Sequence, residues 1–529
     1  MPTSRAIKLL CFAVFSAAAT IVCSSGYVTP GSLAETEQAE GHLAASATAL
    51  QGLLDPGQLP QLPTASLTPS EVPTEVFATA APTPTPAQSP TASPPFIYTA
   101  QAGDTLASLA LRFGVDAAEI ASPQDIAAGL LNPGQILTIP NRVGASGPNQ
   151  RLIPDSDVVL SPSSIDFNTA SYVGRMGGYL ASYREYLPSA WYNGAAVIER
   201  VAYEHSLNPR LLLSILQEQS NWVLGEPSAN APLDYPLGHI DAMQKGLYQQ
   251  LSWAARELSV GYYGWREGTL TQLTFRDGYV LRLAPDLNAG SVAVQYLFSL
   301  LYDYPGWQEK MDPEFGFAFT HGRAMFPDPW LRATQNEPLL TADLTQPYLN
   351  LPFAVNQAWS FTSGPHGAWA PNGAQASLDF APGSLLPGCV PSDSRVVASS
   401  AGLVVRSGMG VLVLDLDGDG YEQTGWVLLY LHVTNKSHLR VGDWVNRGDF
   451  LGNPSCEGGQ ATGTHLHIAR KYNGEWIAAG GPLPFNFSGW VAKSGAAPYL
   501  GTLERDGNVV TACTCANAGT RIARLPEDP

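Results

Sequence analysis

The stretch ATGTHLHIAR, residues 461–470, holds two histidines, His465 and His467, separated by one residue. Successive side chains of a β-strand alternate between its faces, so residues i and i+2 point the same way, about 6–7 Å apart along the strand. Two imidazoles on one face can both address a single metal ion or reacting centre. Two histidines at this spacing also occur by chance, so the interpretation depends on the neighbouring sequence.

Three further candidate residues precede this pair. His366 and Asp379 lie in GPHGAWAPNGAQASLDFAPG, and His432 follows the apolar run WVLLYL. A hydrolytic zinc ion takes three nitrogen or oxygen ligands and keeps one position open for water. Two histidines and one carboxylate meet this need, and two remaining histidines can accept the proton of the water and hydrogen-bond a tetrahedral oxyanion. The pattern therefore predicts a metal-dependent hydrolytic site.

Short alternating runs separated by Gly, Asn and Asp surround these residues. The segments SRVVASSAGLVVRSG, GVLVLDL, GWVLLYLHV and GTHLHIARKY read as successive strands. They predict a mostly β domain over residues 346–500, with residues 501–529 as a C-terminal tail.

This domain resembles the lysostaphin and β-lytic class of zinc endopeptidases over roughly residues 355–475. The resemblance rests on the residues above, on Y-x-H at His432 and on the segment VGDWVNRGDFLG. It implies one Zn²⁺ per chain, bound by His366, Asp379 and His467, with His465 and His432 as catalytic residues beside the metal. The wide spacing between His366 and Asp379 is like that of the β-lytic branch. The alternative is a domain that has kept this fold without catalysis.

Cysteine usage and the N-terminus both suggest export. Residues 1–26 carry two basic residues and then an apolar run, which predicts a signal peptide or an uncleaved anchor, the only expected link to a membrane. Cys23 follows a poor lipobox. The four cysteines beyond residues 1–26 predict disulfides, with Cys389 and Cys456 as the expected pair and Cys513 or Cys515 as rival partners.

Composition limits the class of partner. The net charge is −17 and the isoelectric point is about 4.9, so nucleic acid is not expected to bind. Residues 27–95 are rich in Pro, Thr, Ser and Ala, which predicts a disordered, extended linker.

Residues 96–142 read as a small folded unit. FIYTAQAGDTLASLALRFG predicts a strand and then a helix capped by Asp104 or Thr105, and NPGQILTIPN predicts a closing strand. A second helical stretch is expected near residues 123–128. The unit resembles a LysM domain, which implies a βααβ fold that binds N-acetylglucosamine chains such as peptidoglycan. The alternative is a spacer that binds nothing.

Residues 150–345 read as mostly helical and rich in aromatic residues. Asn208 and Pro209 open the helix PRLLLSILQEQSNWV, and NAGSVAVQYLFSLLYDY predicts a buried helix. The block resembles lysozyme-like lytic transglycosylases, in which a glutamate directly precedes the serine of this helix. Here Gln219 has that place and Glu218 is one residue earlier, a rotation of about 100°. The expectation is a degenerate lysozyme-like domain, with glycan cleavage through Glu218 as the alternative.

Two smaller features complete the survey. DLDGDG, residues 415–420, resembles the first half of a calcium loop, but Trp426 stands where the bidentate glutamate belongs, so an acidic turn is favoured. His438 is expected in a surface loop. Together the segments predict an exported, cell-wall-associated or periplasmic peptidoglycan hydrolase, or alternatively a non-catalytic scaffold or hydrolase activator.

Overall fold

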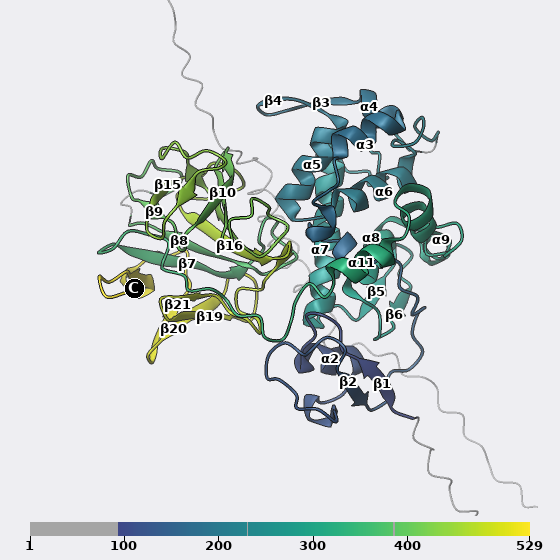
Figure 1. Ribbon diagram of the computed structural model, residues 1–529, viewed down its shortest axis with the longest axis horizontal. Helices are drawn as coiled ribbons and strands as arrows, with labels where there is room; N and C mark the ends of the chain where they lie inside the picture. The colour runs from purple at the N-terminus through teal and green to yellow at the C-terminus, as the bar shows by residue number, and fades with distance from the viewer. Residues whose placement is uncertain (1–93, 230, 384–386, 529) are drawn as a thin grey trace, which may run out of the picture. The chain divides into compact units, whose positions relative to one another are not determined.

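The computed structural model describes residues 94–229, 231–383 and 387–528 (Figure 1). The predicted export segment, residues 1–26, and residues 27–93 of the predicted linker lie outside the described residues. Within the described part of the chain, no helix is long and apolar enough to cross a membrane.

The LysM segment pairs strand β1 (Phe96–Thr99) with β2 (Ile136–Ile139) in an antiparallel sheet covered by helix α2 (Leu106–Phe113). Thr105 caps this helix, because its hydroxyl accepts the Ser108 N–H. Asp104, the other predicted cap, instead forms a buried ion pair with Arg112.

The second helix predicted for this unit is absent from residues 123–128. Besides α2, the described LysM segment has one helical turn, the short 3₁₀ turn η1 (Ala117–Glu119), which precedes that stretch. The Ser122 hydroxyl donates to Ile136 O and accepts the Gln124 N–H, which ties this segment to the start of β2. Such side-chain bonds to the main chain compete with helical hydrogen bonds, so the segment stays irregular.

The middle block is mostly helical. Its helices are α3 (Thr169–Met176), α4 (Tyr179–Ser182), α5 (Gly194–His205), α6 (Pro209–Ser220), α7 (Leu247–Glu267), α8 (Ala289–Leu301), α9 (Tyr304–Lys310), α10 (Phe317–Phe319) and α11 (Pro329–Asn336). Two hairpins accompany them, β3 (Arg184–Leu187) with β4 (Ala190–Asn193), and β5 (Gln272–Thr274) with β6 (Val280–Arg282). Helices α7 and α8 pack closely because Gly261 has no Cβ, which would lie 2.8 Å from the Ala293 Cα.

The C-terminal region is mostly β and is built on a nine-stranded antiparallel sheet. Along the sheet the order is β14-β10-β11-β12-β16-β8-β7-β22, and β17 pairs with β16. Its strands are β7 (Ala358–His366), β8 (Ser377–Ala381), β10 (Gly402–Gly408), β11 (Val411–Asp415), β12 (Trp426–Leu431), β14 (Trp444–Val445), β16 (Leu466–Tyr472), β17 (Glu475–Trp476) and β22 (Arg521–Ala523). Smaller sheets are formed by β13 (Val433–Thr434), β15 (Phe450–Pro454) and β9 (Val396–Val397), and by β18 (Asn486–Phe487), β19 (Trp490–Ser494), β20 (Gly501–Arg505) and β21 (Asn508–Thr511).

Both faces of the large sheet are buried. Leu428 and Ile468 pack on one face, in the core of the β region. On the other face, Leu429 and Ala469 belong to the same apolar cluster as the core of the helical block. Two-sided burial explains why WVLLYL is a continuous apolar run rather than an alternating one.

The prediction of a C-terminal tail over residues 501–529 is wrong. These residues form β20 and β21, which join at Asp506 and Gly507, and β22, which pairs with β7 at the edge of the large sheet. Both turn residues have positive φ, as a tight hairpin requires. Leu503 and Ile522 are buried, so the segment is held by the same cores as the rest of the region.

Candidate metal centre

Four adjacent strands bring the predicted site residues together. His467 on β16 lies directly opposite Asp379 on the neighbouring strand β8, and His366 ends β7, the next strand along. His432 directly follows β12, the neighbour of β16 on its other side. His465 precedes β16 and forms an isolated bridge with Ser455. The sheet order therefore gathers five residues from positions 366 to 467 at one place.

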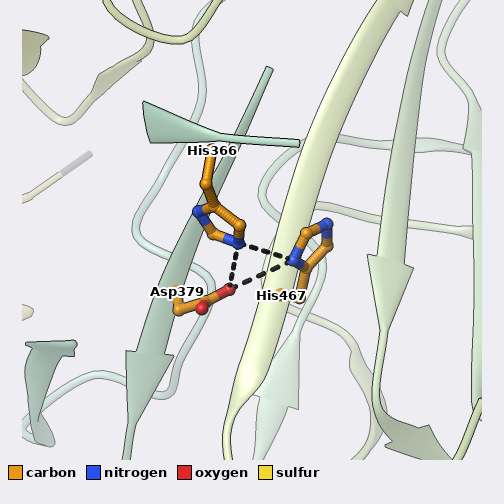
Figure 2. Close-up of side chains that lie close together, drawn as sticks. All are labelled: His366, Asp379 and His467. Atoms are coloured by element: carbon orange, nitrogen blue, oxygen red, sulfur yellow. Dashed lines mark hydrogen bonds and ion pairs between the residues drawn. The ribbon is translucent and has the colours of Figure 1, made fainter. Parts of the chain in front are cut away.

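Three of these residues form a tight group, shown in Figure 2, which we call the metal centre: His366, Asp379 and His467. The His366 Nε2 and His467 Nδ1 atoms are 3.1 Å apart. The Asp379 Oδ1 atom lies 3.3 Å from the first and 3.1 Å from the second. All three residues are buried.

This geometry fits a zinc ion. Ligands that bind tetrahedrally at about 2.0–2.1 Å lie about 3.3 Å from one another, close to the three separations found here. The Asp379 Oδ1 atom is buried and has no hydrogen-bond donor among the described residues. A divalent cation would satisfy this buried oxygen.

Main-chain carbonyl groups orient the two ligand histidines. The His366 Nδ1 lies 2.8 Å from Gly364 O, and the His467 Nε2 lies 2.9 Å from Ala368 O. Because a carbonyl oxygen only accepts, each of these nitrogens carries the proton. The opposite nitrogen of each ring is then unprotonated and faces the centre, as a metal ligand must.

The two predicted catalytic histidines are held in the same way beside the metal centre. The His432 Nδ1 donates to Glu457 O at 2.7 Å, and the His465 Nδ1 donates to Gly463 O at 2.7 Å. Their rings are adjacent, with centroids 4.5 Å apart. The His465 Nε2 is 3.7 Å from Asp379 Oδ2. Each ring therefore keeps its Nε2 as a proton acceptor.

Electrostatics favour an ionised carboxylate at the centre. Burial opposes the protonation of His366, but the charge of Asp379 raises the pKa of this histidine. Burial opposes the charge of Asp379, but His366 and His465 hold the pKa of this carboxyl group well below its usual range. Burial and the neighbouring His465 lower the pKa of His432 to about 3. Burial also lowers the pKa of His467.

Sequence reasoning did not identify Tyr499, which also belongs to the site. Its ring stacks on His366 with centroids 4.6 Å apart, and its main chain bonds both Gly364 and Pro365. Its φ of +70° is unusual for an aromatic residue. A lone tyrosine in an irregular segment carries no sequence signal for this role.

A disulfide lies beside the site. The Sγ atoms of Cys389 and Cys456 are bonded at 2.04 Å, and Thr464, the residue before His465, bonds Gly388 and Val390 on the same loop. Cys513 and Cys515 are bonded to each other and not to this pair.

The remaining predicted residues lie apart from the metal centre. Glu218 on α6 accepts hydrogen bonds from Lys310 at 2.7 Å and from Thr320 at 2.6 Å. His438 is exposed, and the Asp415 carboxylate accepts the Gly420 N–H inside the acidic turn.

Two protein families and several known proteins match parts of this chain. Residues 98–140 match the LysM domain family, and residues 151–339 match the family described as LasA, N-terminal domain. Protease LasA of Pseudomonas aeruginosa strain PAO1 is 29% identical over 300 residues, which cover 52% of this chain and 66% of that protein. Protease LasA of strain UCBPP-PA14 is 29% identical over 303 residues, with the same coverage. The match thus spans just under two thirds of the length of these relatives.

Solved structures of metallopeptidases are also similar. The deep-sea M23 metalloprotease pseudoalterin shares 25% identity, with a TM-score of 0.27, over 32% of this chain and 96% of its own. The catalytic domain of lysostaphin from Staphylococcus simulans shares 23% identity, with a TM-score of 0.18, over 23% of this chain and 90% of its own. The chain thus contains a LysM domain and a LasA-type N-terminal domain, is similar to protease LasA, and carries a His/Asp/His centre in its β region.

Proposed function

We propose that this chain is a zinc-dependent endopeptidase that cleaves peptide bonds in the stem peptides or cross-bridges of peptidoglycan. The observation that carries the proposal is the metal centre, in which His366, Asp379 and His467 direct three ligand atoms at one point, 3.1–3.3 Å apart. These three residues are the proposed ligands of one Zn²⁺ per chain.

Zinc bound there supplies Lewis-acid activation of water and of the scissile carbonyl group. The rest of the mechanism belongs to the chain's own side chains. His465 and His432 each keep an unprotonated Nε2, because the Nδ1 of each ring donates to a carbonyl oxygen. One of them accepts the proton of the attacking water. The imidazolium formed is then a donor, which stabilises the oxyanion and returns the proton to the leaving amine.

The LysM module defines the proposed partner. LysM domains bind N-acetylglucosamine chains, so residues 96–142 are proposed to hold the enzyme on the glycan while the metal centre acts on the attached peptides. This role also implies an exported, cell-wall-associated or periplasmic protein, with residues 1–26 as the export signal or anchor. Ordinary proteins are a second possible substrate, since the matched relative is a protease.

Digestion of purified peptidoglycan tests the proposal directly. The full chain is incubated with the polymer, and new termini are identified by mass spectrometry. New amino termini in the peptides are expected from the wild type and none from His467→Ala, which should also contain almost no zinc. Near-stoichiometric zinc in His467→Ala contradicts the ligand set. If the wild type binds zinc but releases no peptide from peptidoglycan, the alternative of a scaffold or hydrolase activator is favoured.

A second candidate activity is glycan cleavage by the middle block. It rests on the resemblance of helix α6 to the helix of lytic transglycosylases, and the proposed acid is Glu218. The contacts of Glu218 weigh against it, because Lys310 and Thr320 already occupy its two carboxylate oxygens. Anhydro-muropeptides released by the wild type and absent after Glu218→Gln would establish it. Otherwise the middle block is a degenerate lysozyme-like domain.

A further inference from the structure

The middle block has an open hollow that no proposed activity uses. It has a volume of about 520 Å³ and lies between strand β5 and helix α8. Both elements are labelled in the helical block of Figure 1. From β5 and the loop before it come Thr271, Gln272 and Thr274, and from α8 come Tyr296 and Leu300. The volume is in the range of small-molecule sites in proteins.

One edge of β5 is paired with β6, and the other has no strand partner in the part of the chain that the structure describes. The pairing includes bonds from Leu283 N–H to Thr271 O and from Phe275 N–H to Tyr279 O. In an antiparallel pair, alternate residues direct their main-chain groups to the partner strand. The N–H and C=O groups of Gln272 and Thr274 therefore point to the unpaired edge, where their side chains are exposed.

The chemistry of the lining selects the kind of ligand. It consists of hydroxyl groups, one amide, a tyrosine ring and leucine side chains, and it includes no charged side chain. A neutral lining offers no counter-ion to phosphate, carboxylate or ammonium groups. Hydroxyl and amide groups beside an aromatic ring instead suit a neutral sugar, whose hydroxyl groups need donors and acceptors while its ring face packs on the aromatic side chain.

The length of the edge argues against an extended peptide. β5 has three residues, and only Gln272 and Thr274 present main-chain groups outward. Strand addition depends on a row of such bonds, and two residues provide a short one. An N-acetyl group has a single amide, and its one N–H and one C=O need no longer row of main-chain partners than this edge provides.

We propose that this groove binds a segment of N-acetylated glycan and is a second saccharide site in addition to the LysM module. The site is independent of the proposed peptidase activity, because none of its residues belongs to the metal centre. It is also separate from Glu218, whose partners Lys310 and Thr320 do not line the hollow.

The test is calorimetric titration of the full chain with a tetramer of N-acetylglucosamine. Thr274→Trp fills the groove from an exposed position, and Thr334→Trp places the same side chain at an exposed threonine of α11, outside the groove. The expected result is the loss of one binding equivalent per chain in Thr274→Trp and none in Thr334→Trp. Gln272→Glu should weaken the same equivalent by about tenfold, because it replaces an amide donor with an acceptor.

Unchanged stoichiometry and affinity in Thr274→Trp and Gln272→Glu overturns the proposal. So does binding of a stem tetrapeptide that Thr274→Trp abolishes, since the occupant would then be a peptide. If Thr274→Trp fails to fold, as judged by its melting temperature, Gln272→Glu decides alone. Cleavage of a small soluble peptide should be the same in all these variants, which separates failure of this site from failure of the peptidase proposal.

Discussion

Loss of the Cys389–Cys456 disulfide should destabilise the protein far more than loss of the other disulfide. The two bonds close loops of very different length, with sequence separations of 67 and 2. In the chain-entropy model, a cross-link stabilises by reducing the freedom of the unfolded chain, and the effect grows with the logarithm of loop length. Replacing both cysteines of each pair by serine therefore gives two variants with the same chemistry and different expected costs.

The expected magnitudes follow from these separations. Closing a loop of about 67 residues contributes roughly 4 kcal/mol to the free energy of unfolding at 25 °C, and closing one of about 2 residues contributes roughly 1 kcal/mol. The long loop also carries a local effect, because its segment at Gly388 and Val390 bonds Thr464, next to His465. The double variant Cys389→Ser/Cys456→Ser should thus lose peptidase activity while it keeps zinc.

Urea unfolding followed by tryptophan fluorescence measures the first effect. We expect the free energy of unfolding to fall by about 3–4 kcal/mol more in Cys389→Ser/Cys456→Ser than in Cys513→Ser/Cys515→Ser. Equal losses in the two variants would refute the entropic argument. Non-reducing peptide mapping of the wild type provides the control. A bond from Cys389 to Cys513 or Cys515 would mean that the two disulfides do not close the loops on which the comparison depends.

Three further predictions concern the site, the half-buried acid Glu337 and the LysM module. His465→Ala and His432→Ala should keep zinc, and their turnover should fall about 10²-fold. Asp379→Ala should lose both the zinc and the activity. Metal analysis and turnover measured on the same samples test these expectations. Burial and Asp155 raise the pKa of Glu337 to about 7, so the free energy of unfolding should fall as pH rises from about 4.5 to 7. In urea titrations, Glu337→Gln should therefore have a free energy of unfolding about 2–3 kcal/mol above that of the wild type at pH 8, and nearly the same at pH 4. Deleting residues 96–141 should weaken retention on insoluble peptidoglycan and leave cleavage of a small peptide unchanged.

Local patterns were sufficient to predict several strands and helices. The runs around Leu429 and Ile468 form β12 and β16, and the helix opened by Asn208 and Pro209 is α6. Such elements are set by short-range periodicity and by caps, which a sequence displays directly. The prediction of a tail at residues 501–529 failed because the strands there are short, and only their pairing with distant partners makes them part of the sheets.

Residue types at the site were predictable, but their orientation was not. The H-x-H spacing predicts two imidazoles on one face, yet β16 begins at Leu466 and His465 lies in the bridge before it. The ring nitrogen that faces the centre depends on carbonyl groups such as Ala368 O, which is 99 residues away from His467 in the chain. Tyr499 comes from still another segment. No local pattern encodes these long-range contacts.

The middle block shows the same limit at a single residue. Helical geometry predicts that a shift from position 219 to 218 turns a side chain by about 100°. It does not predict which residues the side chain of Glu218 contacts. In the structure Glu218 meets Lys310 and Thr320, which lie 92 and 102 residues further along the chain. These contacts occupy both carboxylate oxygens of Glu218 and hold its side chain in place, which suits a structural role. The acid of helix α6 therefore holds neighbouring segments of the middle block together.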